Sequence, residues 1–136
     1  LGAVWQATIT QLRANCPEIA ELPIAIPTVS SGALSTLSIV ARETNGEVSI
    51  RADLGNEEAS TISFSVWSVP ATEQLCDDAA AQITLRGDDN ACVTEGADGV
   101  GGGWSEDGQA WRFQASSGWS DSVADVVDIV ERLIIV

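Results

Sequence analysis

The chain has 136 residues, with 20 Asp or Glu, six Arg and no Lys, His or Tyr, so its formal net charge is −14. A surface of this charge repels phosphate groups, which excludes nucleic-acid binding and disfavours adsorption to anionic membranes. The missing residue types exclude Ser-His and Cys-His catalytic pairs, Schiff-base chemistry, the P-loop and His-based metal sites.

The length and the apolar content of 45% fit one folded domain. A chain this long buries enough surface to form a core without metal or disulfide help, so we predict a single domain over residues 1–136. Its apolar runs are shorter than the roughly 18 residues of a membrane-spanning helix, and we predict no membrane insertion. The chain starts at Leu1 and contains no Met, which fits the loss of a signal peptide or a cut at a domain boundary equally well.

The first half is predicted to hold a helix and the start of an antiparallel meander. Apolar residues at helical spacing predict a helix over residues 1–16, and the two prolines of residues 21–27 favour an extended edge segment. Residues 36–43 and 47–54 alternate apolar and polar side chains around Asn45-Gly46, which is a strong hairpin signal.

The middle of the chain is predicted to hold a strand, a helix and a loop. The alternation continues in a third strand over residues 61–69, and apolar spacing predicts a second helix over residues 72–85, with Gly87 at its C′ position. A short strand is predicted over residues 91–95. Residues 96–103 hold five glycines in eight positions and are predicted to form a mobile loop.

The last third gives the clearest patterns. Strands over residues 104–106 and 109–116 flank the hairpin signal Asp107-Gly108, and a helix over residues 123–133 leads into a short apolar strand at the end. The order of elements predicts an α+β sandwich. We expect an antiparallel sheet of about six strands, with an N-terminal, a middle and a C-terminal helix packed on it.

The three cysteines, Cys16, Cys76 and Cys92, allow three pairings, and the sequence does not choose among them. A disulfide between Cys76 and Cys92 would stabilise the fold by ~3 kcal/mol and leave Cys16 as a lone thiol. The alternative is three reduced, packed cysteines in a cytoplasmic protein. A structural zinc site is not expected because the chain has no C-x-x-C motif and no His. A catalytic cysteine is not expected because no His or Lys could activate its thiolate.

Carboxylates offer the remaining route to chemistry. Asp77-Asp78 lie on the predicted middle helix, and Asp88-Asp89-Asn90 follow its end. Acid–base catalysis needs two carboxylates in distinct environments across a cleft, which neighbours on a solvated turn do not supply. The second group could ligate Ca²⁺, but the spacing of an EF-hand is absent, and solvated turn residues are the better interpretation. We therefore predict no catalytic residues, no cofactor and no metal.

The tryptophans are the remaining candidates for a site. Trp is enriched at binding surfaces because it offers rigid apolar area and an N–H donor. Trp67 lies on the back of its predicted strand, Trp104 follows the glycine-rich segment and Trp119 precedes the last helix. We predict that these three residues contribute to a site for an apolar ligand, a glycan or a partner protein. The alternative is ordinary packing, which we expect for Trp5 and Trp111.

The end of the chain resembles a known family. The strand after Gly108 runs through Gly118-Trp119-Ser120 into the helix over residues 123–133 and the apolar Ile134-Ile135-Val136. This order is similar to the C-terminal strand–helix–strand of PsbP-like α/β sandwiches, a group that includes small secreted lipoproteins of mycobacteria. The resemblance covers residues 108–136 and implies an extracytoplasmic accessory or binding domain without catalytic residues. The lipid-modified N-terminal Cys of such lipoproteins is missing here.

A second resemblance concerns the first part of the chain. Its helix, hairpin and strand over residues 62–69, followed by the predicted middle helix, are similar to phage tail-terminator and neck proteins, which form rings through their sheet edges. We predict a non-enzymatic, extracytoplasmic accessory domain from the cell envelope of a high-GC bacterium, which binds a partner protein or an apolar ligand. The alternative is a ring-forming virion subunit. An enzyme ranks third because only carboxylates, Ser, Thr and Cys could act.

Overall fold

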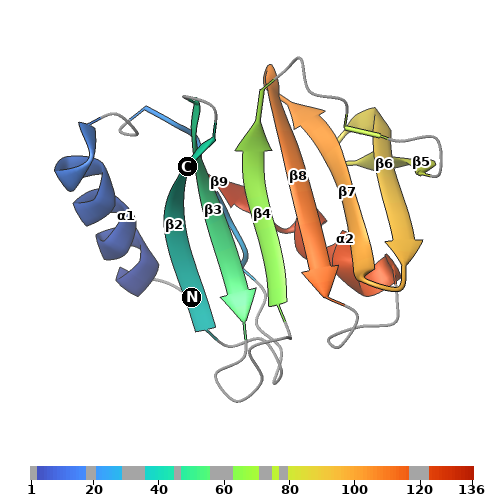
Figure 1. Ribbon diagram of the computed structural model, residues 1–136, viewed down its shortest axis with the longest axis horizontal. Helices are drawn as coiled ribbons and strands as arrows, with labels where there is room; N and C mark the ends of the chain where they lie inside the picture. The colour runs from blue at the N-terminus through green and yellow to red at the C-terminus, as the bar shows by residue number, and fades with distance from the viewer. Residues whose placement is uncertain are drawn as a thin grey trace.

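The structure is a computed structural model, and it describes residues 3–17, 21–28, 36–44, 47–55, 63–70, 75–76, 80–116 and 123–136 (Figure 1). These residues form two helices, α1 (Ala3–Asn15) and α2 (Val123–Glu131). They also form nine strands, which are β1 (Ala25–Ile26), β2 (Thr36–Thr44), β3 (Glu47–Gly55), β4 (Ser63–Val69), β5 (Ala81–Leu85), β6 (Asp88–Gly96), β7 (Gly99–Glu106), β8 (Gln109–Ser116) and β9 (Ile134–Ile135).

Seven strands form one antiparallel sheet in the order β2-β3-β4-β8-β7-β6-β5, and β1 pairs with β9 in a separate two-stranded ribbon. The sheet therefore consists of two meanders that meet where β4 pairs with β8. In Figure 1, α2 and the β1–β9 ribbon lie behind the sheet, and α1 lies beside β2. We call the sheet face toward α2 the inner face and the opposite face the outer face.

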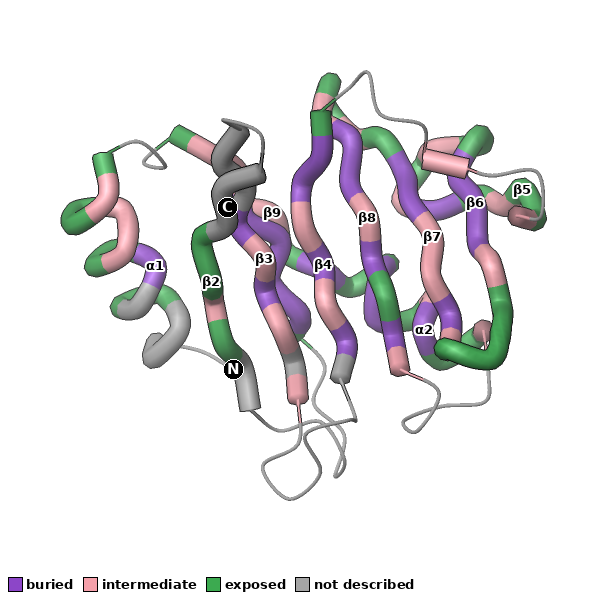
Figure 2. The backbone as a smooth tube through the Cα atoms, viewed as in Figure 1, coloured by how far each residue is buried: buried purple, intermediate pink, exposed green. Residues whose placement is uncertain are grey.

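The inner face carries the core. Phe64 and Val66 of β4 and Trp111 and Phe113 of β8 are buried, and they alternate with more exposed residues that point outward. Figure 2 shows this alternation along both strands. Trp104 stacks on Trp111 with 5.9 Å between the ring centroids. The helix α2 adds three buried aliphatic side chains to the same core cluster, namely Val126, Ile129 and Val130.

Several predictions made from local pattern are confirmed. The protein is α+β with an antiparallel sheet, a helix near each end and a short final strand, β9. β2 and β3 stay paired up to Thr44 and Glu47, as the hairpin signal predicted, although Asn45-Gly46 lie outside the described residues. The β7–β8 turn has positive φ at Asp107 and Gly108, 52° and 78°, as a type I′ turn requires.

The predicted middle helix is wrong at its C-terminal end, because Ala81–Leu85 is strand β5. Of the rest of residues 72–85, only residues 75, 76 and 80 are described, and none of the three is helical. A short apolar run is compatible with the spacing of a helix and with that of a buried strand. Here, pairing with β6 makes the segment a strand. Gly87 is accordingly not a helix cap. It is the second residue of a hairpin turn in which Arg86 and Gly87 have φ of 50° and 84°.

The prediction of a mobile loop over residues 96–103 is also wrong. β6 extends to Gly96 and β7 begins at Gly99, so most of the segment is paired strand. The sheet has seven strands rather than about six because β5 replaces part of the predicted middle helix. A Cβ on Gly102 would collide with the carbonyl oxygen of Cys92 and lie 2.7 Å from Cζ of Phe113. Glycine is present there because neighbouring groups leave no space for a side chain.

Candidate functional site

A hollow of about 580 Å³ lies on the outer face of the sheet. Its floor includes the backbone of Gly99 and Gly101 on β7. Side chains from β4, β6, β8, the β6–β7 turn and the segment before β5 line it, and the ones that matter here are Trp67, Leu75, Thr94, Asp98, Arg112 and Gln114.

The register of the sheet explains why this part of the outer face is recessed. Gly101 pairs with Thr94 on one side and with Gln114 on the other, so two polar side chains face each other across a residue without one. In the neighbouring row, Arg112 pairs with Trp67 of β4. Alternation along each strand therefore brings an aromatic ring, a guanidinium, an amide and a hydroxyl to one place.

The Cys76–Cys92 disulfide is confirmed, and it fixes one end of the hollow. Cys92 lies on β6, so the bond attaches the segment before β5 to the outer face of the sheet. Leu75 is thereby held over Gly103, where an added Cβ would lie 3.1 Å from Leu75 Cδ2. The third cysteine, Cys16, follows α1 as a partly buried free thiol.

The three tryptophans predicted for a site have different surroundings. Trp67 is half-buried and lines the hollow. Trp104 is 0% exposed and belongs to the core, so its ring presents no surface to a ligand in this structure. Trp119 lies outside the described residues. Trp111 is buried in the core, as expected, whereas the side chain of Trp5 is not among those described.

The four polar residues that line the hollow were not singled out from the sequence: Thr94, Asp98, Arg112 and Gln114. A signal existed for two of them, because Arg112 and Gln114 alternate with the apolar Trp111 and Phe113 and so belong on the opposite face. For Thr94 and Asp98 the sequence offered nothing comparable, since their placement depends on β7 being a strand rather than a loop.

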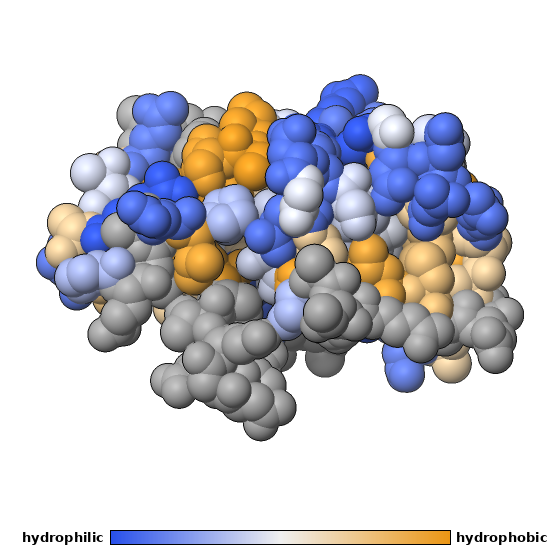
Figure 3. All heavy atoms as spheres, turned by 90° about the horizontal axis from the view of Figure 1, so that it is seen from above, coloured by the Kyte–Doolittle hydropathy of each residue, from blue (hydrophilic) through white to orange (hydrophobic). Residues whose placement is uncertain are grey.

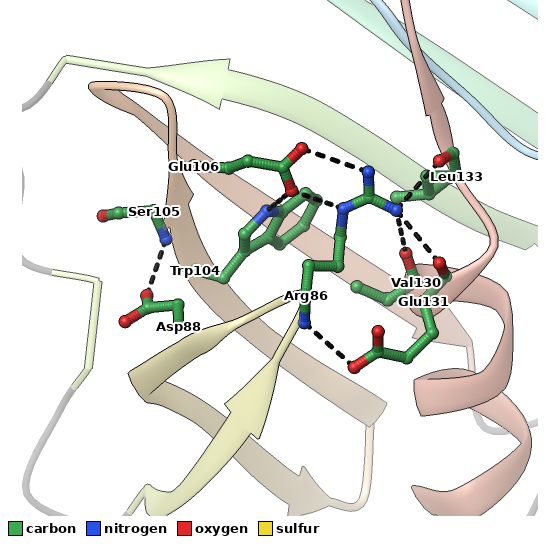
Figure 4. Close-up of polar contacts among 8 residues, drawn as sticks. All are labelled: Arg86, Asp88, Trp104, Ser105, Glu106, Val130, Glu131 and Leu133. Atoms are coloured by element: carbon green, nitrogen blue, oxygen red, sulfur yellow. Dashed lines mark hydrogen bonds and ion pairs between the residues drawn. The ribbon is translucent and has the colours of Figure 1, made fainter.

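A second polar cluster surrounds Arg86 and joins three elements (Figure 4). The guanidinium pairs with Glu106 of β7, and its Nη2 donates to Glu106 Oε2 at 3.1 Å. Its Nη1 donates to the carbonyl oxygens at the C-terminal end of α2, those of Val130, Glu131 and Leu133, at 2.8–3.1 Å. Arg86 thus caps α2 and ties it to the sheet, so this cluster has a structural role.

The carboxyl group of Glu106 should make stability depend on pH. The hydrogen bond and charge of Arg86 hold the pKa of Glu106 below its ordinary value of 4.5 against the opposing effect of burial, and the Trp104 N–H contributes. Because the folded-state pKa is depressed, the stabilisation is complete above about pH 4.5 and is lost as the pH falls through the folded value. Between pH 7 and pH 3, the free energy of unfolding in urea should therefore fall less for Glu106→Gln than for the wild type. Parallel curves would contradict this role.

Asp88-Asp89-Asn90, predicted to be solvated turn residues, are instead the first residues of strand β6, and Asp77-Asp78 lie outside the described residues. The carboxylate of Asp88 accepts hydrogen bonds from the backbone N–H of Asn90 at 3.0 Å and of Ser105 at 2.8 Å. The described residues contain no group of three or more His, Cys, Asp or Glu that could hold a metal ion. Neither helix of the described chain has the length and hydrophobicity needed to cross a membrane.

Comparison of the chain with protein-family models, curated proteins and solved structures finds no match. The hollow and the disulfide are therefore the features of the chain that bear on its function. The resemblances to PsbP-like sandwiches and to tail-terminator proteins stay predictions.

Proposed function

We propose that this chain is a non-enzymatic, extracytoplasmic accessory domain of a bacterial cell envelope, and that it binds a partner protein or a ligand with an apolar surface in the outer-face hollow. The observation that carries the proposal is the hollow itself, with the half-buried Trp67 in its wall. Small-molecule sites in proteins are concave, about 300–1,000 Å³ in volume, and combine apolar surface with a few polar groups. The hollow has this size, and it combines the apolar Trp67 and Leu75 with a larger share of polar groups than such sites usually have.

The disulfide supports the cellular location. Disulfides form and persist in oxidising compartments and are rare in cytosolic proteins of mesophiles. Here the bond does more than connect two segments, because Leu75 next to it forms part of the wall of the hollow. An oxidising environment would therefore keep the proposed binding site assembled.

The proposal is tested by ¹H–¹⁵N correlation spectra of the full chain titrated with three probes: maltose, digalacturonate and 1-hexanol. They represent a neutral saccharide, an anionic saccharide and an apolar molecule. We expect at least one probe to shift the Trp67 indole N–H and the backbone amides of Thr94 and Gly101. The amides of α1 should stay unchanged. If no probe shifts signals around the hollow, the proposed site is wrong.

A ring-forming structural subunit is the second candidate, and one observation favours it. β2 is a nine-residue strand at one edge of the seven-stranded sheet, with Val40 at its centre 40% exposed, although α1 lies beside it. Long edge strands can pair with another chain. Figure 3 shows hydrophilic side chains beside separate apolar patches on the described part of the face seen from above. Analytical ultracentrifugation separates the two, because a closed oligomer would favour the subunit and a monomer the binding domain.

A further inference from the structure

We infer that the ligand of the outer-face hollow is a neutral saccharide of one or two rings. This inference rests on the proposed function and adds the chemical class of the ligand. Three features of the hollow lead to it: an aromatic ring, polar groups that include both donors and acceptors, and one charged side chain of each sign.

Trp67 gives the hollow an apolar, rigid wall. A half-buried indole can lose further water-accessible area on binding, which is favourable and demands little ordering of the side chain. A sugar ring has a face of C–H groups that matches such a surface. Gly99 on the floor lets a flat ring approach the backbone closely, because it has no Cβ. The Gln114 side chain lies over Gly101, so its amide stands next to the place where the ring would lie.

The remaining wall offers hydrogen-bonding groups of both kinds. The Gln114 amide and the Thr94 hydroxyl can each donate and accept, the Arg112 guanidinium donates and the Asp98 carboxylate accepts. Sugar hydroxyls also do both, so they match the Gln114 amide, the Thr94 hydroxyl and the Asp98 carboxylate. A purely apolar ligand would cover these groups without replacing their bonds to water, and each such loss costs free energy.

Charge selects a neutral ligand over an ionic one. Within the described wall, Arg112 and Asp98 oppose each other in sign, so neither a cation nor an anion gains a uniform field there. The chain as a whole carries −14, which repels anionic ligands at long range. A neutral saccharide needs no uniform field in the hollow and is not repelled by the net charge of the chain.

The test compares the maltose arm of the titration with the other two probes and uses two variants, Trp67→Ala and Gln114→Ala. We expect maltose to shift the Trp67 and Gln114 side-chain signals with millimolar affinity, and each variant to weaken that affinity by about tenfold. Gln6→Ala is the matched control, since Gln6 is an exposed amide on α1. It should bind as the wild type does. Trp67→Phe keeps an aromatic ring and should retain part of the affinity, even if Trp67→Ala does not fold.

The outcomes separate this inference from the proposed function. If 1-hexanol or digalacturonate shifts the signals around the hollow and maltose does not, the saccharide inference is wrong and the proposed binding site stands. Maltose binding that Gln114→Ala and Trp67→Phe leave unchanged would also overturn it. If none of the probes acts on the hollow, the inference and the proposed function both fail.

Discussion

Replacing Arg86 with alanine is expected to lower the free energy of unfolding by about 3 kcal/mol, because the change removes an ion pair and several hydrogen bonds from partly buried groups. The side chain is only 14% exposed and pairs with Glu106, whose side chain is 21% exposed. It also donates to the carbonyl oxygens of Val130, Glu131 and Leu133 at and just after the end of α2, and of these Val130 O accepts a second hydrogen bond, from the Leu133 N–H at 3.3 Å. Denaturation by urea, followed by tryptophan fluorescence, measures the difference.

Two variants separate the causes of that loss. Arg132→Ala is the matched control, because Arg132 pairs with Asp128 one turn away at 3.2 Å and both side chains are more than half exposed. Its loss should stay below about 0.5 kcal/mol. Arg86→Gly removes the same contacts but relieves the positive φ of 50°, so it should be about 1 kcal/mol more stable than Arg86→Ala. Equal losses for Arg86→Ala and Arg132→Ala would show that Arg86 does not hold α2 to the sheet.

Local patterns predicted those elements whose own residues determine their structure. In α2 the buried Val126, Ile129 and Val130 follow helical spacing, and the Asp107-Gly108 turn follows from two residues that tolerate positive φ. The prediction failed where pairing with a neighbouring strand determines the secondary structure of a segment. Ala81–Leu85 is a strand because β6 pairs with it, and that pairing leaves no signal within five residues.

The candidate site was predictable only in part, for the same reason. Trp67 could be placed on the back of its strand by alternation, and it lines the hollow. The sequence could not distinguish the surroundings of Trp104 from those of Trp67, because both residues belong to strands. Trp104 lies in the core, where it stacks on Trp111, and this contact is not visible from the sequence. The position of Leu75 depends on which cysteines pair, and the sequence allowed three pairings.

The glycines of β7 give the second large expected effect. Gly102→Ala should lower the free energy of unfolding by about 3 kcal/mol, since its Cβ would meet the backbone carbonyl of Cys92 and the ring of Phe113, and neither can move away cheaply. Gly101→Ala is the matched control on the adjacent residue. Its Cβ would meet the end of the flexible, exposed Gln114 side chain, so the loss should stay within about 0.5 kcal/mol.

The pair is informative because the two positions differ in their neighbours and not in their backbone. Neither Gly101 nor Gly102 is among the glycines with positive φ, so the conformational strain of alanine is similar at both. Equal stabilities of the two variants would mean that β6 and β8 do not enclose β7 as described. If Gly101→Ala keeps its stability but displaces Gln114, it should weaken maltose binding in a folded protein. The inner face of β7, at Gly102, would then determine stability, and its outer face, at Gly101, would determine binding.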